Sequence, residues 1–351
     1  MRFGLSFLPD GDPGTQSASA YYKDALRLCR EADRAGLDFV KMTEHYLKAY
    51  GGYCPSPLQF LSAVAACTDR IRLMTGGIMA MFHHPVQIAA QTAMLDALSQ
   101  GRAEIGFARA YLPYEFDAFG VPLDGSRERF MATVQTVRRL WTEETVTVDT
   151  PYFTLREATN LPRCVQQPHP PTWIAAVQSR QSFAWIAEQG FKLLVTPGIG
   201  GFETQREFLS IYRESFRPHP SNPDGVAEVA LSLPIFIAKD RSTAVAESDR
   251  YLRRYLDVWT ASARAWDHTR SDDYPRYTGF GNALAADTSA SMRDRRAALV
   301  GGPDEIVQQI SELKDYLDID TFLWQIDCGT MPGDVAMRTL DLFVDKVRPQ
   351  L

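Results

Sequence analysis

Glu44, His45 and Tyr46 stand in a row within KMTEHYL, the stretch that directly follows the mainly apolar run Leu37–Val40. Ionisable residues seldom close an apolar segment unless they belong to a functional site or to a hydrogen-bonded core network. An imidazole can take up or release a proton near neutral pH, so His45 is a candidate general acid or base. The alternative is a half-buried histidine that only bonds the backbone, and the adjacent Glu44 makes the catalytic interpretation the better one.

A second group of residues is suited to an anion. Arg109 comes just after an expected strand, and Ser179 and Ser182 stand where a helix is expected to begin. A guanidinium offers a planar pair of donors to phosphate or carboxylate, and the N–H groups at a helix start favour an anion. Together they predict an anion-binding site. The alternatives are a surface arginine paired with Glu115 or Asp117, and ordinary helix-capping serines.

Small residues stand at or near the ends of two of the expected strands. Gly76 and Gly77 serve either a turn or the close approach of a planar ligand to the backbone. Gly106 and Ala108 leave room for a flat group near Arg109.

Other residue patterns exclude common functions. His83 and His84 are adjacent and would point to opposite sides of a strand, and no carboxylate set completes a metal site around them. One of them could lie beside a ligand while the other caps a helix or packs. The common hydrolase and nucleotide-binding motifs are missing from the sequence. The Trp and Tyr residues are expected mostly in the core.

Strand-like and helix-like segments alternate along the chain and must position these residues. The expected strands cover 2–8, 38–43, 71–77, 102–108, 172–177, 191–196, 228–238 and 321–327. The expected helices cover 19–36, 55–68, 84–101, 127–142, 182–190, 205–216, 242–266 and 334–347. Eight strands alternating with helices in one domain of 351 residues favour a (β/α)8 barrel over an open sheet. His45 then lies at a strand's carboxyl end, on the rim where barrel active sites form.

Two excursions interrupt the alternation, at about 143–171 and 267–300. Long segments of this kind in a compact domain are often functional. We expect both at the barrel face that carries the active site, and the second one as a lid.

Composition limits the partners and the compartment. The net charge is −6 without a run of Lys or Arg, so nucleic acid and anionic membranes are poor partners. No apolar segment approaches the roughly 20 residues of a membrane span, and the N-terminus is typical of a first strand and not of a signal peptide. The five scattered cysteines contain no C-x-x-C pair, which indicates a reduced, cytoplasmic protein.

Two apolar stretches predict self-association. LQFLSAVAAC and PVQIAAQTAMLDAL, in the second and third expected helices, hold more apolar residues than one buried stripe requires. We expect a homodimer packed through these helices.

Several segments together resemble one family across nearly the whole chain. They are the E-H pair after the second strand, HHP before the third helix, DALSQGRAEIGFARAY, SRERF, PPTWIAAVQSRQSFAWIAEQG and LVGGPDEIVQQISEL. In this combination and order the sequence resembles the bacterial-luciferase-like family of flavin-dependent monooxygenases. The resemblance implies a (β/α)8 barrel that binds reduced FMN as co-substrate at the carboxyl face. A separate reductase would supply the flavin, and one atom of dioxygen would enter an apolar or aromatic small molecule.

The resemblance also implies roles for individual residues. His45 matches the catalytic base, Glu115 matches an aspartate near the flavin ring, and Gly76–Gly77 matches a cis peptide bond under that ring. It assigns cofactor contacts to Glu44, Gly76, Gly77, Ala108, Arg109, Val177, Gln178, Ser179, Arg180 and Ser182. No metal is implied.

The sequence departs from light-emitting luciferases at three places. Ala108 stands in place of a reactive cysteine, Tyr46 replaces a second histidine, and the phosphate loop reads VQSRQS. These departures argue against light emission and aldehyde oxidation but not against flavin binding. A deazaflavin-dependent dehydrogenase of the same fold and a non-catalytic flavin-binding protein remain as alternatives, and the sequence does not name a substrate.

Overall fold

Eight parallel strands close into a barrel in the computed structural model, which describes residues 1–177, 179–197, 201–222 and 225–351. The barrel strands are β1 (Arg2–Phe7), β2 (Phe39–Met42), β3 (Arg72–Thr75), β5 (Ala103–Ala108), β8 (Thr172–Ala175), β9 (Lys192–Val195), β10 (Val229–Ile237) and β12 (Thr321–Gln325). Each pairs with the next in this order, and β12 pairs with β1 to close the ring. The predicted (β/α)8 barrel and all eight predicted strands are confirmed. The short strands β4 (Ile78–Met79) and β11 (Leu299–Gly301) pair in parallel with β5 and β10.

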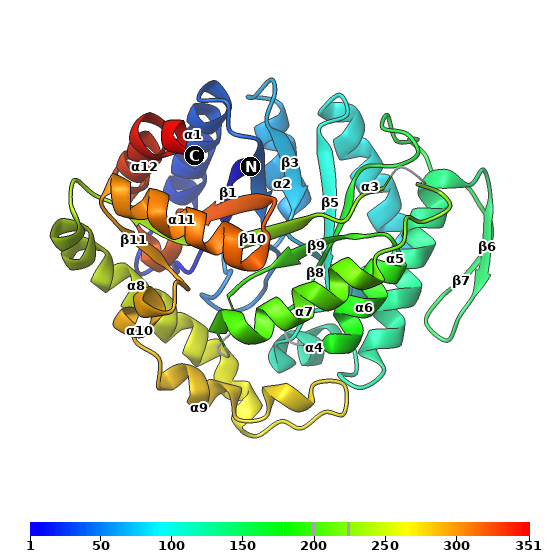
Figure 1. The fold of residues 1–351 in the computed structure, drawn as a ribbon. Helices are drawn as coiled ribbons and strands as arrows, with labels where there is room; N and C mark the ends of the chain where they lie inside the picture. Colours follow the sequence, from blue (N-terminus) through cyan, green and yellow to red (C-terminus); the bar gives the residue numbers. More distant parts are fainter. Residues whose placement is uncertain (178, 198–200, 223–224) are drawn as a thin grey trace.

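Helices surround the strands (Figure 1). The longer ones are α1 (Ala18–Arg34), α2 (Pro57–Ala65), α3 (Pro85–Leu98), α5 (Ser126–Thr142), α6 (Arg180–Glu188), α7 (Gly201–Ser215), α8 (Arg241–Ala263), α11 (Pro303–Leu317) and α12 (Gly333–Leu342). Three short ones are α4 (Pro113–Phe119), α9 (Phe280–Ala285) and α10 (Ser289–Asp294). Most begin as expected, with Ser17, Ser56 and Asp240 accepting the first N–H groups of α1, α2 and α8.

One long helix, α11, was not among those expected from the sequence. Its signals are nevertheless present, because Ile306, Ile310, Leu313 and Leu317 recur at helical spacing and are buried. A proline at the first helical position supports the same start.

The barrel interior is built in layers. Phe39, Met74, Trp173, Leu194, Ala230 and Leu323 form an apolar plug that is almost completely buried. Side chains on one face of a strand recur every two residues, so the next inward layer holds Ser6, Lys41, Ser232 and Gln325. This polar layer is the floor of a cavity at the carboxyl ends of the strands.

The two excursions lie in different places. Residues 143–171 form the hairpin β6 (Val146–Asp149) and β7 (Thr154–Ala158) beside α5, at the edge of the molecule in Figure 1. Gln166 donates from Nε2 to the Ala103 carbonyl at the amino end of β5, and no residue of 143–171 lines the cavity. The expected position of this excursion at the active face is therefore wrong, because it connects a helix to the next strand's start. The excursion 267–300 does cover the cavity, through the segment 272–277.

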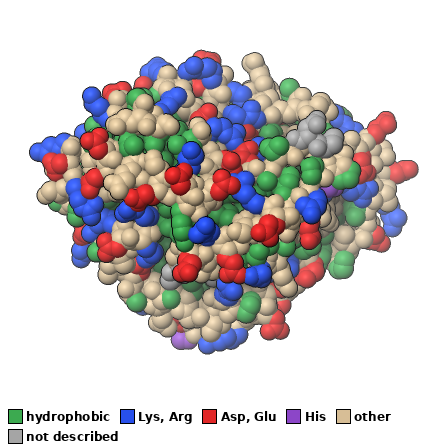
Figure 2. All heavy atoms as spheres, in the orientation of Figure 1, with side chains coloured by type: hydrophobic (Ala, Val, Ile, Leu, Met, Phe, Trp, Pro, Cys, Tyr) green, Lys and Arg blue, Asp and Glu red, His purple; other side chains and the backbone are tan. Residues whose placement is uncertain are grey.

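The outer surface agrees with the charge pattern of the sequence. Basic and acidic side chains are interspersed over the face shown in Figure 2. None of the described helices is long and apolar enough to cross a membrane. All five cysteines are described, and each has a free thiol.

Candidate active site

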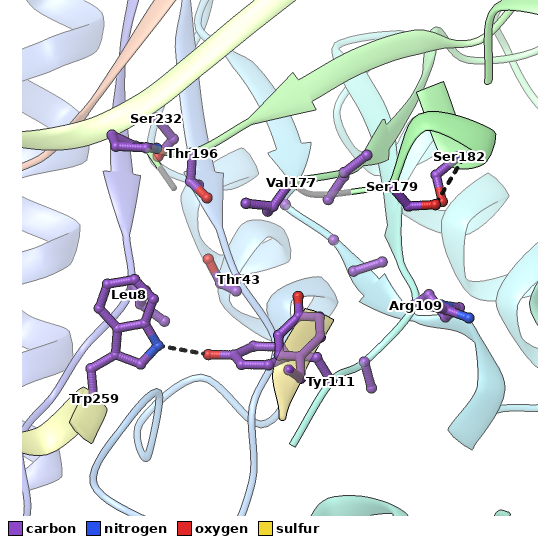
Figure 3. A pocket seen from close by; sticks show the side chains of 18 of the residues that line it. Leu8, Thr43, Arg109, Tyr111, Val177, Ser179, Ser182, Thr196, Ser232 and Trp259 are labelled. Carbon is purple, nitrogen blue, oxygen red and sulfur yellow. Dashed lines mark hydrogen bonds between the residues drawn. The ribbon is translucent and has the colours of Figure 1, made fainter. Parts of the chain in front are cut away.

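A cavity of about 460 Å³ opens at the carboxyl ends of the barrel strands. This volume is within the ~300–1,000 Å³ typical of small-molecule sites. Figure 3 shows Arg109, Ser179 and Ser182 on one side of the cavity and Leu8 and Trp259 on the other, with Tyr111 between them and hydrogen-bonded to Trp259. The first side is polar and cationic, and the second is aromatic.

The cationic end combines two arginines with a helix N-terminus. Ser179 caps α6 by accepting from the Ser182 backbone N–H at 3.3 Å. Arg127, at the start of α5, donates to the Ser182 and Ser179 hydroxyls at 3.0 and 3.3 Å. Burial, and then the nearby charge of Arg109, lowers the pKa of Arg127. Two guanidiniums and the first N–H groups of a helix form a strong anion site, of which Arg127 was not identified from the sequence.

Arg109 is held by the lid segment and not by the partners considered as alternatives. Its Nη2 donates to the Asp273 carbonyl at 3.0 Å, and its Nη1 lies 3.8 Å from the Asp273 carboxylate. The guanidinium lies over the Tyr274 ring at 4.0 Å. Among the described residues, the buried Nη1 has no hydrogen-bond partner. A negatively charged lid residue therefore faces the anion site, and part of the Arg109 donor capacity remains available.

A wall of small residues continues from the anion site. Gly76, Gly77, Ala108 and Val177 all line the cavity, and the Gly76–Gly77 peptide bond is cis, as the resemblance implied. Gly106 does not line the cavity, because a Cβ there would collide with the Thr75 carbonyl. Its small size serves the close packing of β3 against β5 and makes no room for a ligand, contrary to the sequence interpretation.

His45 lines the cavity, and its ring contacts Glu115, which lies behind the cavity wall. His45 Nδ1 lies 3.1 Å from Glu115 Oε1, which also accepts from the Tyr46 backbone N–H at 2.9 Å. Glu115, on α4, is completely buried and is not part of the cavity wall. His45 is 3% exposed and packs against the ring of Tyr50. His45 is therefore at the expected end of the barrel, as a packed and oriented group within the cavity wall.

Glu44 lies behind the wall as well. It accepts from the Met79 backbone N–H at 2.9 Å and from the Tyr46 hydroxyl, and it contacts His83 Nε2 at 2.6 Å. Burial would lower the pKa of His83, but the hydrogen bond and charge of Glu44 outweigh it and raise that pKa. Glu44, just beyond the end of β2, thus links this segment to β4 and to His83. Its side chain does not line the cavity.

Neither of the adjacent histidines lies beside the cavity. His84 caps α3 by accepting from the Val86 N–H at 3.3 Å, and His83 is paired with Glu44. Within the described ranges of the chain, no three His, Cys, Asp or Glu side chains are grouped as metal ligands would be.

The second end of the cavity is an aromatic chamber formed by Tyr50, Tyr111, Tyr255, Trp259 and Tyr277. Trp259 donates to the Tyr111 hydroxyl at 2.9 Å and stacks on Tyr50 with ring centroids 6.2 Å apart. Burial raises the pKa of each of these tyrosines, so their hydroxyls stay protonated. Tyr50 and Tyr255 belong to the buried core and the other three pack against it, as expected of these aromatic residues, and all five also line the cavity.

The sequence profile of the luciferase-like monooxygenase family matches residues 1–318. The chain belongs to this family. Membership makes it a flavin-dependent monooxygenase, the enzyme class that the sequence resemblance indicated.

Three known proteins are similar to this chain in sequence or in fold. The oxygenase component of the flavin-dependent trigonelline monooxygenase of Acinetobacter baylyi is 29% identical over 99% of this chain and 95% of its own length. The crystal structure of monooxygenase RslO1 from Streptomyces bottropensis superposes with a TM-score of 0.83, at 33% identity over 99% of both chains. The oxygenating constituent of 3,6-diketocamphane monooxygenase of Pseudomonas putida, solved with FMN, has a TM-score of 0.80. It is 18% identical over 100% of this chain and 99% of its own, and shows a shared fold.

In this luciferase-like monooxygenase most of the predicted site residues meet at one cavity. The wall contains His45, Gly76, Gly77, Ala108, Arg109, Val177, Ser179, Arg180 and Ser182. Arg180 is largely exposed and paired with Glu207, so it contributes at the edge. Glu44 and Glu115 lie behind the wall, and Gln178 lies outside the described residues.

Proposed function

We propose that this protein is the oxygenase component of a two-component system that uses reduced FMN and dioxygen to oxidise an apolar or aromatic small molecule. The observation that carries the proposal is the shared cavity, with a cationic site at one end and an aromatic chamber at the other. The buried Nη1 of Arg109, without a partner among the described residues, is a donor suited to a phosphate oxygen.

The residues present fit a phosphorylated flavin. Arg109, Arg127 and the start of α6 would hold the phosphate, and the wall at Gly76–Gly77 would lie against the flat ring. When bound and reduced, FMN supplies the electrons that activate dioxygen.

The chain's own groups would position the substrate and handle protons. The aromatic chamber binds an apolar molecule and, with the lid over it, excludes water from the reacting atoms. His45, whose Nδ1 is fixed by Glu115, is placed to hold or move a proton at the cavity wall. Glu115 is a positioning residue in this scheme, because it does not reach the cavity.

The flavin would come from a separate reductase. The sequence has no G-x-G-x-x-G fingerprint for a nicotinamide dinucleotide. The purified protein mixed with FMN should therefore not oxidise NADPH, whereas chemically reduced FMN, oxygen and a panel of apolar substrates should yield an oxygenated product. Rapid NADPH oxidation by the protein alone would refute the two-component proposal.

Binding measurements separate this proposal from the two alternatives. We expect reduced FMN to bind more tightly than riboflavin or the deazaflavin F420. Tight F420 binding without FMN binding would indicate the dehydrogenase, and FMN binding without oxygen uptake for any substrate would indicate a non-catalytic flavin protein.

We also propose a homodimer formed through α2 and α3 in the cytoplasm. Met94 and Leu98 lie one turn apart on α3 and are 55% and 52% exposed, as expected of a surface that a second copy covers. Light scattering at micromolar concentration tests this, and a monomer would contradict it.

A further inference from the structure

The floor of the cavity contains a buried cation that the proposed function does not use. Lys41 lies on the inward face of β2, between Phe39 of the apolar plug and Thr43, and only 3% of it is exposed. A buried charge is costly unless it is paired and hydrogen-bonded. A lysine in this layer therefore requires a physical reason.

The partners of Lys41 are uncharged. Its Nζ donates to the Ser6 and Ser232 hydroxyls at 3.0 and 3.3 Å, and these two hydroxyls are 2.9 Å from each other. In the part of the chain that the structure describes, Lys41 forms no salt bridge. An ammonium group has three N–H donors, so one donor remains for a further acceptor.

One buried carboxylate, that of Asp327, acts on the charge of Lys41 without contacting it in a salt bridge. Burial lowers the pKa of Lys41 to about 8, against the opposing charge of Asp327. Burial, followed by the charge of Asp10, raises the pKa of Asp327 to about 7. Asp327 also accepts a hydrogen bond from the Tyr21 hydroxyl at 2.9 Å. Of the floor residues Ser6, Lys41, Ser232 and Gln325, only Lys41 has an ionisable side chain, and Asp327 does not line the cavity.

Lys41 adjoins the wall proposed for the flavin ring. A Cβ placed on Gly76 would collide with the Cγ, Cδ and Cε atoms of Lys41, so the lysine stem packs directly against this glycine. The phosphate end has its own cations, Arg109 and Arg127. The charge of Lys41 is therefore next to the ring site and separate from the phosphate site.

We infer that Lys41 stabilises the negative charge of reduced FMN and makes this site select the reduced over the oxidised cofactor. The inference rests on the proposed function. Reduced flavin, once its N1 proton is lost, shares a negative charge between N1 and the C2 carbonyl oxygen, whereas the oxidised ring is neutral. A cation near that edge favours the reduced form, as protein charges near flavin nitrogens generally do.

Replacement by a neutral side chain separates this role from a structural one. Burying a charge without a paired counter-charge costs stability, and an apolar side chain of similar size does not carry that cost. Lys41→Met should therefore keep or raise the melting temperature while it lowers the preference for reduced FMN. Lys41→Gln, which keeps a donor to the serine hydroxyls but no charge, provides a second neutral variant.

The experiment measures the dissociation constants of reduced and oxidised FMN under anaerobic conditions. We expect the ratio of the oxidised to the reduced constant to fall at least about tenfold in both Lys41 variants, mainly through weaker binding of reduced FMN. A tenfold change corresponds to a midpoint potential about 30 mV lower for the bound two-electron couple. Lys192→Met is the matched control, because Lys192 is a barrel lysine paired with Glu228 at 2.7 Å and does not line the cavity.

The outcomes distinguish this inference from the proposed function. Wild-type protein that binds neither form of FMN would refute both. An unchanged ratio in the two Lys41 variants, an equal loss of both redox forms, or loss of the fold in both variants would refute the role of Lys41 alone. Weaker binding of a probe such as benzoate by Lys41→Met, with an unchanged FMN ratio, would likewise overturn it and assign the lysine to a substrate anion.

Discussion

Asp273 should compete with the flavin phosphate for Arg109, and removing its charge should tighten FMN binding. The Asp273 carboxylate lies 3.8 Å from Arg109 Nη1 and accepts from the Arg127 backbone N–H at 3.3 Å. A phosphate entering this site must displace the carboxylate or bind beside a like charge. Asp273→Asn keeps the size and an acceptor oxygen of the side chain and removes only the charge.

The structure sets limits on the size of the effect. Two unit charges about 4 Å apart interact by about 4 kcal/mol at an effective dielectric constant of ~20, and exposed ion pairs contribute only about 0.2–1 kcal/mol. The Arg109 and Asp273 side chains are 16% and 19% exposed, so the pair lies between these limits. We expect Asp273→Asn to bind FMN about tenfold more tightly, which corresponds to about 1.4 kcal/mol.

Titration of FMN and of riboflavin, which lacks the phosphate, tests the reasoning. Riboflavin affinity should stay nearly constant in Asp273→Asn, and the gain for FMN should shrink at high salt. Asp272→Asn is the matched control, since Asp272 also lines the cavity, carries the same charge and forms no ion pair with Arg109 in the described structure. Unchanged or weaker FMN binding in Asp273→Asn, or an equal gain for riboflavin, would refute the competition.

Three further changes have defined outcomes. Arg109→Ala should weaken FMN by tens- to thousands-fold, as expected when one partner of a partly buried charge contact is removed, and leave riboflavin nearly unaffected; equal loss of both ligands in titration would place Arg109 away from the phosphate. His45→Gln, which can still bond Glu115, should lower single-turnover product yield by about 10²–10⁴-fold with little change in melting temperature, and an unchanged yield would return His45 to a structural role. For Asp327, burial raises the folded-state pKa from 3.8 to about 7, so its ionisation destabilises the fold increasingly between about pH 4 and pH 7. Asp327→Asn should therefore be more stable than wild type above pH 7, by at most about 4 kcal/mol, and equal to it near pH 4 in urea unfolding; no difference at pH 8 would contradict this.

The fold could be predicted because each barrel strand is a short apolar segment followed by a helix of different periodicity. The same reasoning placed His45 and Arg109 at one face, since the carboxyl ends of parallel strands meet there. The prediction failed for the excursion at 143–171, whose position depends on whether it follows a strand or a helix. The hairpin at 146–158 follows a helix and precedes a strand, so its chain direction leads it away from the active face.

The missed site residues are those whose role depends on contacts between distant segments. Arg127 begins a helix and meets the serines of α6 more than 50 residues later. Lys41 sits within an apolar strand, and the spacing of two from Phe39 that turns it inward was available in the sequence. Glu115, and not the chain neighbour Glu44, contacts His45, because His45 lines the cavity just beyond the end of β2 whereas the adjacent Glu44 does not.

The lid joins the two ends of the cavity through a few neighbouring residues. Asp273 and Tyr274 contact Arg109, and Tyr277, only three residues beyond Tyr274, packs against Tyr111 with ring centroids 5.5 Å apart. Tyr274 also donates to the Ala110 carbonyl at 2.7 Å, which ties the segment to the end of β5. Because Asp273 and Tyr277 are only four residues apart in the chain, a shift of Asp273 at the anion site would move residues next to the aromatic chamber. We therefore expect a phosphate that displaces Asp273 to shift Tyr277 as well, whereas a cofactor without a phosphate would leave the Asp273 carboxylate beside Arg109.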